Sequence, residues 1–295
     1  MKFAIHGRAF AETSRSYIAE IFKELASHNV QYQISEVFAE ILQKSEIEFN
    51  ADKTFNSPAT LDFNDLALSI GGDGSFLETL EFVARKSTPV LGINFGRLGF
   101  LTDIEPQNIK KTISDLVAHN YAIDERIMLK AEASSELFEM GMNFALNEIA
   151  ISKTDTSSMI VIHAYVDGQF LNSYWADGLM VSTPTGSTGY SLSCGGPLVM
   201  PDSENFIITP ICPHNLFVRP IIVSSKSTIT LKVETRSNNF LLSMDSRARI
   251  IGNEIGEITV SLEECKAKLV KMAGSEFFTI LRKKLKWGED VRNRP

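Results

Sequence analysis

Residues 66–74 read Leu66-Ala67-Leu68-Ser69-Ile70-Gly71-Gly72-Asp73-Gly74, an apolar run that ends in a glycine-rich turn. The first five residues predict a buried strand, and residues 75–84 after the turn predict a helix. Three glycines in four positions let backbone N–H groups face a ligand, and a helix N-terminus adds unpaired donors and partial positive charge. We therefore expect a phosphate-binding turn in which Asp73 can accept a proton or help to hold a metal. A strand-to-helix turn capped by an aspartate remains an alternative.

The sequence around this turn alternates strands with helices. Apolar runs predict two more strands, at residues 2–6 and 90–93. Apolar residues at helical spacing predict three helices, at residues 14–28, 37–42 and 109–119. Residues 45–65 are polar and contain a proline, which favours a loop. The alternation predicts a parallel sheet covered on both faces, in a Rossmann-like α/β domain over residues 1–120.

The pattern changes after about Tyr121. Runs rich in β-branched and aromatic residues recur without helical spacing, at residues 160–166, 220–223, 228–233, 240–244 and 258–262. They predict a β-rich, β-sandwich-like domain over residues 121–270, with Asp167-Gly168 at a tight hairpin turn. Over residues 271–295, the stripe of Phe277, Phe278, Leu281 and Leu285 predicts a helix that returns to pack on the first domain. The expected fold class is thus α/β plus all-β.

Composition narrows the classes of function. The chain has 295 residues, enough for two domains, and 44% of them are hydrophobic. The net charge of −7 argues against binding to DNA or RNA, which depends on Lys and Arg. No apolar run approaches the roughly 18 residues of a membrane helix, and the N-terminus lacks the pattern of a signal peptide. We expect a cytoplasmic protein with no membrane or nucleic-acid partner.

Three cysteines, Cys194, Cys212 and Cys265, are far apart and form no C-x-x-C pair. This spacing argues against a disulfide framework and against a structural zinc site. Because unpaired cysteines are usually buried, we expect three buried free thiols. No residue of the chain is assigned as a metal ligand.

Two further motifs are candidates for a site. The first is a glycine-rich block after the next predicted strand, and the second is a polar pair between two apolar stretches. Gly92-Ile93-Asn94-Phe95-Gly96-Arg97-Leu98-Gly99-Phe100-Leu101-Thr102 follows the next strand, so its glycines are expected at the same carboxyl edge of the sheet as Gly71–Gly74, where ligands bind. Taken alone, this block favours a turn packed by its large apolar side chains over direct contact with a ligand. Asn147-Glu148 needs polar partners if it is buried, and ribose hydroxyls and a carboxamide are candidates. A surface turn explains that pair as well.

The longest motif runs from Asp177 to Pro197. Its segment 182–193 contains seven Ser or Thr residues, two glycines and Tyr190. Many small donors and acceptors beside one aromatic face are typical of a site for a nucleotide base and its sugar, and unlike a charged loop or a core strand.

These motifs together resemble a known family. The chain has no Gly-Lys dipeptide for a Walker loop, and Leu77 stands where a dinucleotide fingerprint needs glycine. Instead, Gly-Gly-Asp-Gly, the Gly92–Thr102 block, Asn147-Glu148 and the Asp177–Pro197 block follow the order and approximate spacing of the NAD kinases, from about Leu66 to beyond Met244. The Thr-Pro-Thr-Gly-Ser-Thr stretch is highly specific for that family. Diacylglycerol kinases, sphingosine kinases and phosphofructokinases have turns similar to Gly-Gly-Asp-Gly.

The resemblance implies Mg²⁺-dependent transfer of the ATP γ-phosphoryl group to the 2′-hydroxyl of the adenosine ribose of NAD, giving NADP. It implies that Asp73 is the general base. The residues implied to bind substrate are Asp73, Gly74, Asn147, Glu148, Asp177, Thr188, Gly189, Tyr190, Ser191, Leu192, Ser193 and Arg247. It also implies a homo-oligomer, a dimer or a tetramer, and it leaves polyphosphate open as a donor.

Three positions depart from the family pattern. Gly189 stands where Ala is usual, Trp175 stands where many members have Arg, and Asp245-Ser246-Arg247 replaces a frequent Asp-Gly-Gln. Two alternatives stay open. One is a lipid kinase with the same turn, although the hydroxyl-rich segment is a poor lining for acyl chains. The other is a catalytically inactive NAD-sensing protein, which the presence of Asp73 disfavours.

Overall fold

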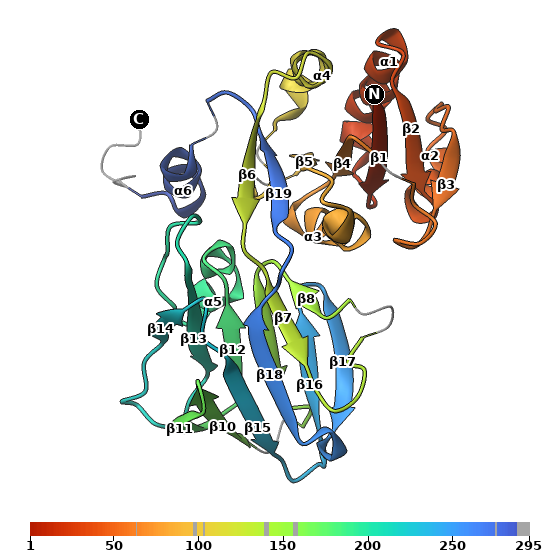
Figure 1. Cartoon of the computed structure of the whole chain (residues 1–295). Coiled ribbons are helices and arrows are strands. Elements are labelled where there is room, and N and C mark those ends of the chain that lie inside the picture. The colour runs from red at the N-terminus through yellow and green to blue at the C-terminus, as the bar shows by residue number, and fades with distance from the viewer. Residues whose placement is uncertain are drawn as a thin grey trace. The chain divides into compact units, whose positions relative to one another are not determined.

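A computed structural model describes residues 1–62, 64–96, 99–102, 104–138, 142–155, 159–274 and 276–287. Contacts within the chain divide it into two compact units (Figure 1). Met1–Asp124 and Lys268–Pro295 make up the first unit, and Glu125–Ala267 make up the second. Each unit has a hydrophobic core of its own.

The first unit is built on a seven-stranded sheet. In spatial order its strands are β3 (Lys53–Phe55), β2 (Gln31–Ser35), β1 (Lys2–Gly7), β4 (Leu66–Ile70), β5 (Val90–Ile93), β19 (Ala267–Lys271) and β6 (Ala122–Arg126). The pairings from β3 to β19 are parallel. The predicted parallel sheet is confirmed, and β4 and β5 have the bounds that the sequence predicted.

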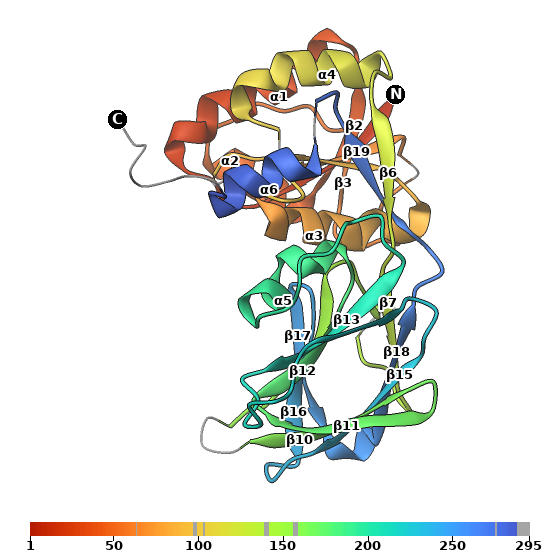
Figure 2. The same ribbon diagram turned by 90° about the vertical axis from the view of Figure 1, so that its left-hand side faces the viewer.

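Helices cover both faces of this sheet. The α-helices of this unit are α1 (Arg15–Ser27), α2 (Glu36–Lys44), α3 (Asp73–Val83), α4 (Ile109–Val117) and α6 (Phe277–Leu285). Figure 2 shows α1 and α4 on one side of the sheet and α3 on the other. Helix α1 buries the four apolar residues expected from its spacing, Ile18, Ile21, Phe22 and Leu25. The sheet edge that carries the glycine-rich turn is therefore fixed by packing on both sides.

Three predictions for this unit were wrong in detail. Residues 53–55, inside the expected loop, form β3, an edge strand in which only Phe55 is buried, so that it lacks an apolar pattern. Residues 267–270 were expected inside the β-rich domain, with no strand predicted there, but they form most of β19, which pairs with β5 in the first sheet. Phe278 is 56% exposed, whereas Leu281 of the same predicted stripe is buried.

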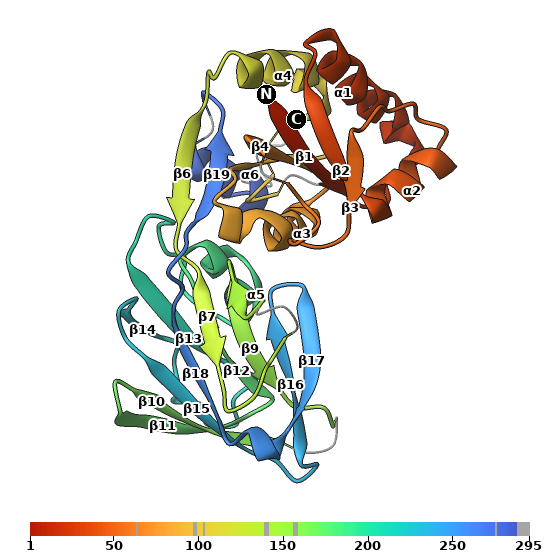
Figure 3. The same ribbon diagram turned by 45° about the vertical axis from the view of Figure 1, so that its right-hand side comes forward.

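The second unit contains two six-stranded antiparallel sheets (Figure 3). The first, in spatial order, is β11 (Gln169–Ala176), β10 (Ile160–Val166), β15 (Ile229–Glu234), β18 (Glu257–Leu262), β7 (Leu129–Glu132) and β8 (Phe144–Ala145). The second is β14 (Ile221–Ser224), β13 (Asn205–Ile211), β12 (Gly178–Ser182), β9 (Glu148–Ser152), β16 (Asn239–Met244) and β17 (Arg247–Gly252). Alternate residues such as Ile149 and Ile151 of β9 enter the core, which confirms the β-rich domain. The Asp167-Gly168 hairpin is also confirmed, with left-handed φ angles of 51° and 77°.

None of the three cysteines forms a disulfide, but their expected burial was wrong. Cys212 is exposed, and Cys194 and Cys265 are half-buried. Cys212 directly follows β13 in a left-handed conformation, so it lies outside the ladder that buries its neighbour Ile211. Among the helices that the structure describes, none is long and apolar enough to cross a membrane.

Candidate functional site

The glycine-rich turn joins β4 to α3 in the first unit. Gly71 has a left-handed φ of 144°, and a Cβ there would lie 2.3 Å from Oγ of Ser75, so the turn requires glycine at this position. Gly72 is the N-cap of α3, and Asp73 is its first residue. A Cβ on Gly72 or Gly74 would meet nothing within 4 Å. The backbone at this helix N-terminus is therefore open to an approaching anion.

The carboxylate of Asp73 is held by the turn that follows the neighbouring strand. Its Oδ2 accepts a hydrogen bond from the backbone N of Phe100 at 2.9 Å, and its Oδ1 accepts one from the backbone N of Leu101 at 3.1 Å. The hydroxyl of Thr102 donates to Oδ1 at 2.9 Å. Asp73 is thus fixed in one orientation beside the open helix end.

Two glycines of the 92–102 block make this contact possible. A Cβ on Gly99 would lie 2.0 Å from Oδ1 of Asp73, and a Cβ on Gly92 would lie 2.4 Å from the methyl carbon of Thr102. The sequence favoured a packed turn for this block and missed its contact with Asp73. The signal was the block's position after the next parallel strand, because both strands end at one edge of the sheet. Arg97, Leu98 and Asp103 lie outside the described residues.

In the second unit, Asn147 precedes β9 and Glu148 is the first residue of that strand, and the backbone of both is held by Asp245. The two carboxylate oxygens of Asp245 accept hydrogen bonds from the backbone N–H groups of Leu146, Asn147 and Glu148, at 2.7, 2.8 and 3.1 Å. Asp245 adopts a left-handed φ of 52° just after β16. The sequence motif pointed to Arg247 instead of Asp245, because nothing in a sequence shows which backbone N–H groups a carboxylate will meet.

The hydroxyl-rich segment packs against the same pair. The backbone N of Thr183 donates to the carbonyl of Asn147 at 2.9 Å. A Cβ on Gly186 would lie 2.1 Å from that carbonyl oxygen, and one on Gly189 would lie 3.2 Å from Oε2 of Glu148. The predicted residues Asn147, Glu148 and Gly189 are therefore brought together. Because the contact at Gly189 is tight, the glycine that replaces the usual alanine gives Glu148 more room.

Glu148 has a strongly raised pKa in this cluster. Burial raises its pKa from an ordinary 4.5 to about 8, and the nearby charge of Asp245 adds to the effect. The backbone N–H of Tyr190 donates to the carboxyl group and opposes the shift. Its Oε2 is buried and has no hydrogen-bond partner within the described residues. A buried carboxyl oxygen that lacks a partner is suited to a polar group of a ligand.

Asp177 lies at the other end of the same strand pair. In the pairing of β12 with β9, Ser182 is opposite Glu148 and Gly178 is opposite Ser152. Glu148 therefore stands at one end of the paired stretch, and Asp177 directly precedes the other end. Tyr190 begins the short helix α5 (Tyr190–Ser193) and is 45% exposed. Burial raises the pKa of its hydroxyl most, Cys194 raises it further, and the charge of Asp177 adds a smaller effect. Asp177 pairs with Nζ of Lys153 at 2.7 Å. Sequence reasoning missed Lys153, which places a cation beside Asp177 where Trp175 replaces an expected arginine.

The side chains of three predicted binding residues make hydrogen bonds inside the second unit. Ser191 is fully buried and shares a 3.0 Å hydrogen bond with Thr209, and the hydroxyl of Thr188 donates to the carbonyl of Thr185 at 3.0 Å. The guanidinium of Arg247 donates to the carbonyls of Met142 and Phe144 and lies over the rings of Phe138 and Phe144. Ligand contact by these side chains stays a prediction. Leu192 is half-buried and Ser193 exposed on α5.

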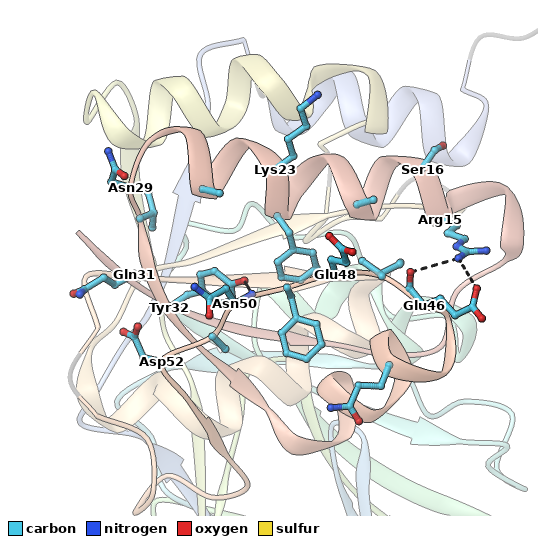
Figure 4. Close-up of a pocket in the computed structure, with 18 of the residues that line it drawn as sticks. Arg15, Ser16, Lys23, Asn29, Gln31, Tyr32, Glu46, Glu48, Asn50 and Asp52 are labelled. Atoms are coloured by element: carbon cyan, nitrogen blue, oxygen red, sulfur yellow. Dashed lines mark hydrogen bonds and ion pairs between the residues drawn. The ribbon is translucent and has the colours of Figure 1, made fainter.

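A large hollow of about 1940 Å³ lies in the first unit between α1 and residues 46–52 (Figure 4). None of the predicted site residues lines it. Figure 4 shows Arg15 directed at Glu46, with Lys23, Glu48 and Asp52 elsewhere on the wall. The wall thus carries both signs of charge and gives no reason to assign a class of ligand.

Comparison with known proteins gives similarity over almost the whole chain. The sequence profile of the ATP-NAD kinase N-terminal domain matches residues 4–121, and that of the ATP-NAD kinase C-terminal domain matches residues 146–272. An NAD kinase of Cytophaga hutchinsonii is 47% identical over 294 residues, which are 99% of this chain and 100% of that protein. An NAD kinase of Flavobacterium johnsoniae is 43% identical, with coverage of 99% and 100%.

Two solved structures resemble the protein. Yeast NADH kinase complexed with NADH has a TM-score of 0.85 at 24% identity and covers 100% of this chain and 90% of its own, a likeness of fold alone. An NAD kinase from Archaeoglobus fulgidus in complex with ATP has a TM-score of 0.74 at 26% identity, with coverage of 97% and 99%. They match the combination of a parallel-sheet α/β unit and an antiparallel β unit.

The close approach of Gly99 to Asp73 gives the first prediction. Gly99→Ala is expected to destabilise the protein by about 1–3 kcal/mol, because a Cβ overlaps the carboxylate. In an Asp73→Ala background the same substitution should cost less, because one of the overlapping groups is gone. Denaturant unfolding of the four proteins of this cycle measures the coupling. Equal costs in both backgrounds would contradict the contact.

The raised pKa of Glu148 gives a prediction about pH. The unfolded carboxyl group ionises near pH 4.5, whereas the folded one keeps its proton to about pH 8. Between these values the unfolded state releases a proton that the folded state retains, so this group makes the protein less stable as pH rises, by at most about 1.4 kcal/mol per pH unit. Glu148→Gln should remove this contribution. Unfolding of both proteins from pH 5 to pH 9 tests it, and parallel stability curves would refute the shift.

Proposed function

The chain belongs to the ATP-NAD kinase family, and from this premise we propose how its own residues transfer a phosphoryl group from ATP to NAD. It is an enzyme, a phosphotransferase that forms NADP. The two alternatives left open by the sequence, a lipid kinase and an inactive NAD sensor, are set aside because the relatives that match 99% of the chain are NAD kinases.

We propose that Asp73 is the general base. It takes the proton of the adenosine 2′-hydroxyl while that oxygen bonds to the γ-phosphorus and the bond to ADP breaks. One observation carries this assignment. Asp73 places a carboxylate, held by three hydrogen bonds, beside a helix N-terminus whose glycines leave the backbone open. A positioned base and an anion site thus occur on the same turn.

The phosphates of the donor are proposed to lie against Gly71–Gly74. The first N–H groups of α3 have no partner inside the helix, and the partial positive charge of the helix end favours anions. The openness at Gly72 and Gly74 supports close approach of a phosphate to the backbone. ATP is the proposed donor, and polyphosphate would present similar phosphate groups to the same turn.

The residues of the second unit are proposed to bind NAD. Protonated Glu148 can both donate and accept a hydrogen bond, as a ribose hydroxyl or a carboxamide requires. Asn147 offers an amide beside it, and Tyr190 offers a half-exposed ring. The remaining members of the proposed set are given by motif position: Asp177, Thr188, Gly189, Ser191, Leu192, Ser193 and Arg247.

Magnesium is proposed to arrive with the nucleotide. Among the described residues no group of three His, Cys, Asp or Glu side chains gathers as a metal site. Mg²⁺ in such enzymes is usually held by substrate phosphates with one or two carboxylates. Because the carboxylate of Asp73 is assigned to the proton of the 2′-hydroxyl, the phosphates are proposed to supply most of the ligands of the ion. When bound, the ion would neutralise charge on the phosphates.

We further propose a cytoplasmic homo-oligomer. The free cysteines support a reducing compartment. Leu216 and Phe217 are 82% and 90% exposed, and Ile222 of edge strand β14 is 48% exposed. Exposed apolar side chains next to an unpaired strand edge favour contact with a second copy of the chain.

Replacement of Asp73 tests the base. Asp73→Asn is expected to lower kcat for NADP formation by about 10²–10⁴ while NAD binding stays within a few-fold. The new amide would direct an N–H group at a turn whose own N–H groups also donate, and two donors that face each other destabilise the fold. The melting temperature is therefore measured alongside the kinetics. Asp62→Asn, an exposed aspartate paired with Lys53, is the control and should keep wild-type turnover. Wild-type turnover by Asp73→Asn with bound NAD would refute the role.

Replacement of Phe217 tests the oligomer. Phe217→Ser is expected to shift the mass in sedimentation equilibrium toward the monomer, because it removes a large apolar side chain from the proposed contact. Phe278→Ser, at a phenylalanine of the first unit that is 56% exposed, is the control and should leave the mass unchanged. A monomeric wild-type protein, or a Phe217→Ser protein of unchanged mass, would contradict the proposal.

A further inference from the structure

Asn94, just after β5, has an amide whose orientation is fixed by its partners. It is 5% exposed. Its Oδ1 accepts a hydrogen bond from the backbone N of Gly96 at 2.7 Å, and only the oxygen of an amide can do so. Its Nδ2 therefore faces Thr102, where it donates to the carbonyl oxygen at 3.2 Å and to Oγ1 at 3.0 Å.

This orientation decides where the hydroxyl proton of Thr102 points. A hydroxyl has one proton and two lone pairs, and Nδ2 of Asn94 is a donor only, so Oγ1 accepts from it. The proton of Thr102 is then directed at Oδ1 of Asp73, 2.9 Å away. Thr102 is fully buried, so water does not compete for this proton. Gly96, Asn94, Thr102 and Asp73 thus form one hydrogen-bonded chain with a single direction.

The two oxygens of Asp73 are unequal as a result. Among the described residues, Oδ1 accepts two hydrogen bonds, from Thr102 and Leu101, whereas Oδ2 accepts one, from Phe100. A carboxylate offers about two lone-pair positions on each oxygen. The position that these residues leave open is on Oδ2.

We propose that Asn94 and Thr102 are positioning residues that hold Oδ1 of Asp73, so that Oδ2 is the atom that takes the proton of the 2′-hydroxyl. This inference rests on the proposed function of Asp73. The step breaks the O–H bond of the ribose hydroxyl and forms an O–H bond at Oδ2. Neither Asn94 nor Thr102 touches the substrate, and both act through the orientation of the carboxylate.

The methyl group of Thr102 allows packing to be separated from hydrogen bonding. The methyl lies over Gly92, where a Cβ would approach it to 2.4 Å. Thr102→Val keeps the side-chain shape and loses the hydroxyl. Thr102→Ser keeps the hydroxyl and loses the methyl. A positioning role therefore predicts a lower kcat for Thr102→Val than for Thr102→Ser, whereas a structural role predicts the reverse order.

Steady-state kinetics of the full-length enzyme tests the proposal. Thr102→Val is expected to lower kcat by about 10- to 100-fold, part of the contribution of a positioned base, with the KM values for NAD and ATP within about two-fold. Thr102→Ser should keep kcat within about three-fold while its melting temperature falls. Asn94→Asp, which turns an acceptor toward the hydroxyl, should lower kcat as Thr102→Val does. Thr88→Val, at a buried threonine of the same unit, is the matched control and should keep wild-type kcat.

The outcomes separate this proposal from the function of Asp73. Loss of turnover in Asp73→Asn but wild-type kcat in Thr102→Val would overturn the positioning role and leave the base in place. A fall of kcat in Thr102→Ser as large as in Thr102→Val would show packing instead. If Asp73→Asn itself retains turnover, the base assignment has failed. In the double variant Asp73→Asn/Thr102→Val, the proposal expects no loss beyond that of Asp73→Asn, and additive losses would contradict it.

Discussion

Hydrogen bonds from residues 100–102 to the carboxylate of Asp73 join two neighbouring connections of the parallel sheet. One connection leads from β4 into α3, and the other follows β5. Parallel strands bring both to one edge, but only small residues at 92 and 99 let the second turn come close enough to bond. The site in the first unit depends on this contact, because it sets the direction of the carboxylate beside the open helix end.

The second unit uses the same kind of bond for a different purpose. In the first unit, backbone N–H groups hold a carboxylate that is proposed to react. In the second, the carboxylate of Asp245 holds the backbone of residues 146–148, which presents Glu148. The proximity of Asp245 also helps to raise the pKa of Glu148. Thus one acidic side chain supplies both the geometry and part of the electrostatic environment of the proposed NAD-binding carboxyl group.

Much of the fold could be predicted because it follows from local periodicity. Strands β4, β5 and β10 and helix α1 lie where apolar spacing placed them, since a buried face imposes its period on the sequence. The two errors in strand assignment share one cause. Strand β3 is too short to carry a period, and the sheet that receives β19 is chosen by a partner far away in the chain. Neither pairing leaves a local signal.

The sequence alone determined the fold class, the family resemblance and the residue types of the site, because apolar periodicity and the order of glycines, hydroxyls and carboxylates in a motif are properties of the sequence itself. Tertiary structure decided which atoms meet. The link from Asn94 through Thr102 to Asp73, the contact of Asp245 with residues 146–148, and the pairing of Lys153 with Asp177 each join residues from different connections. Hydrogen bonds and ion pairs depend on distances of about 3 Å, and those distances exist only once distant segments have packed.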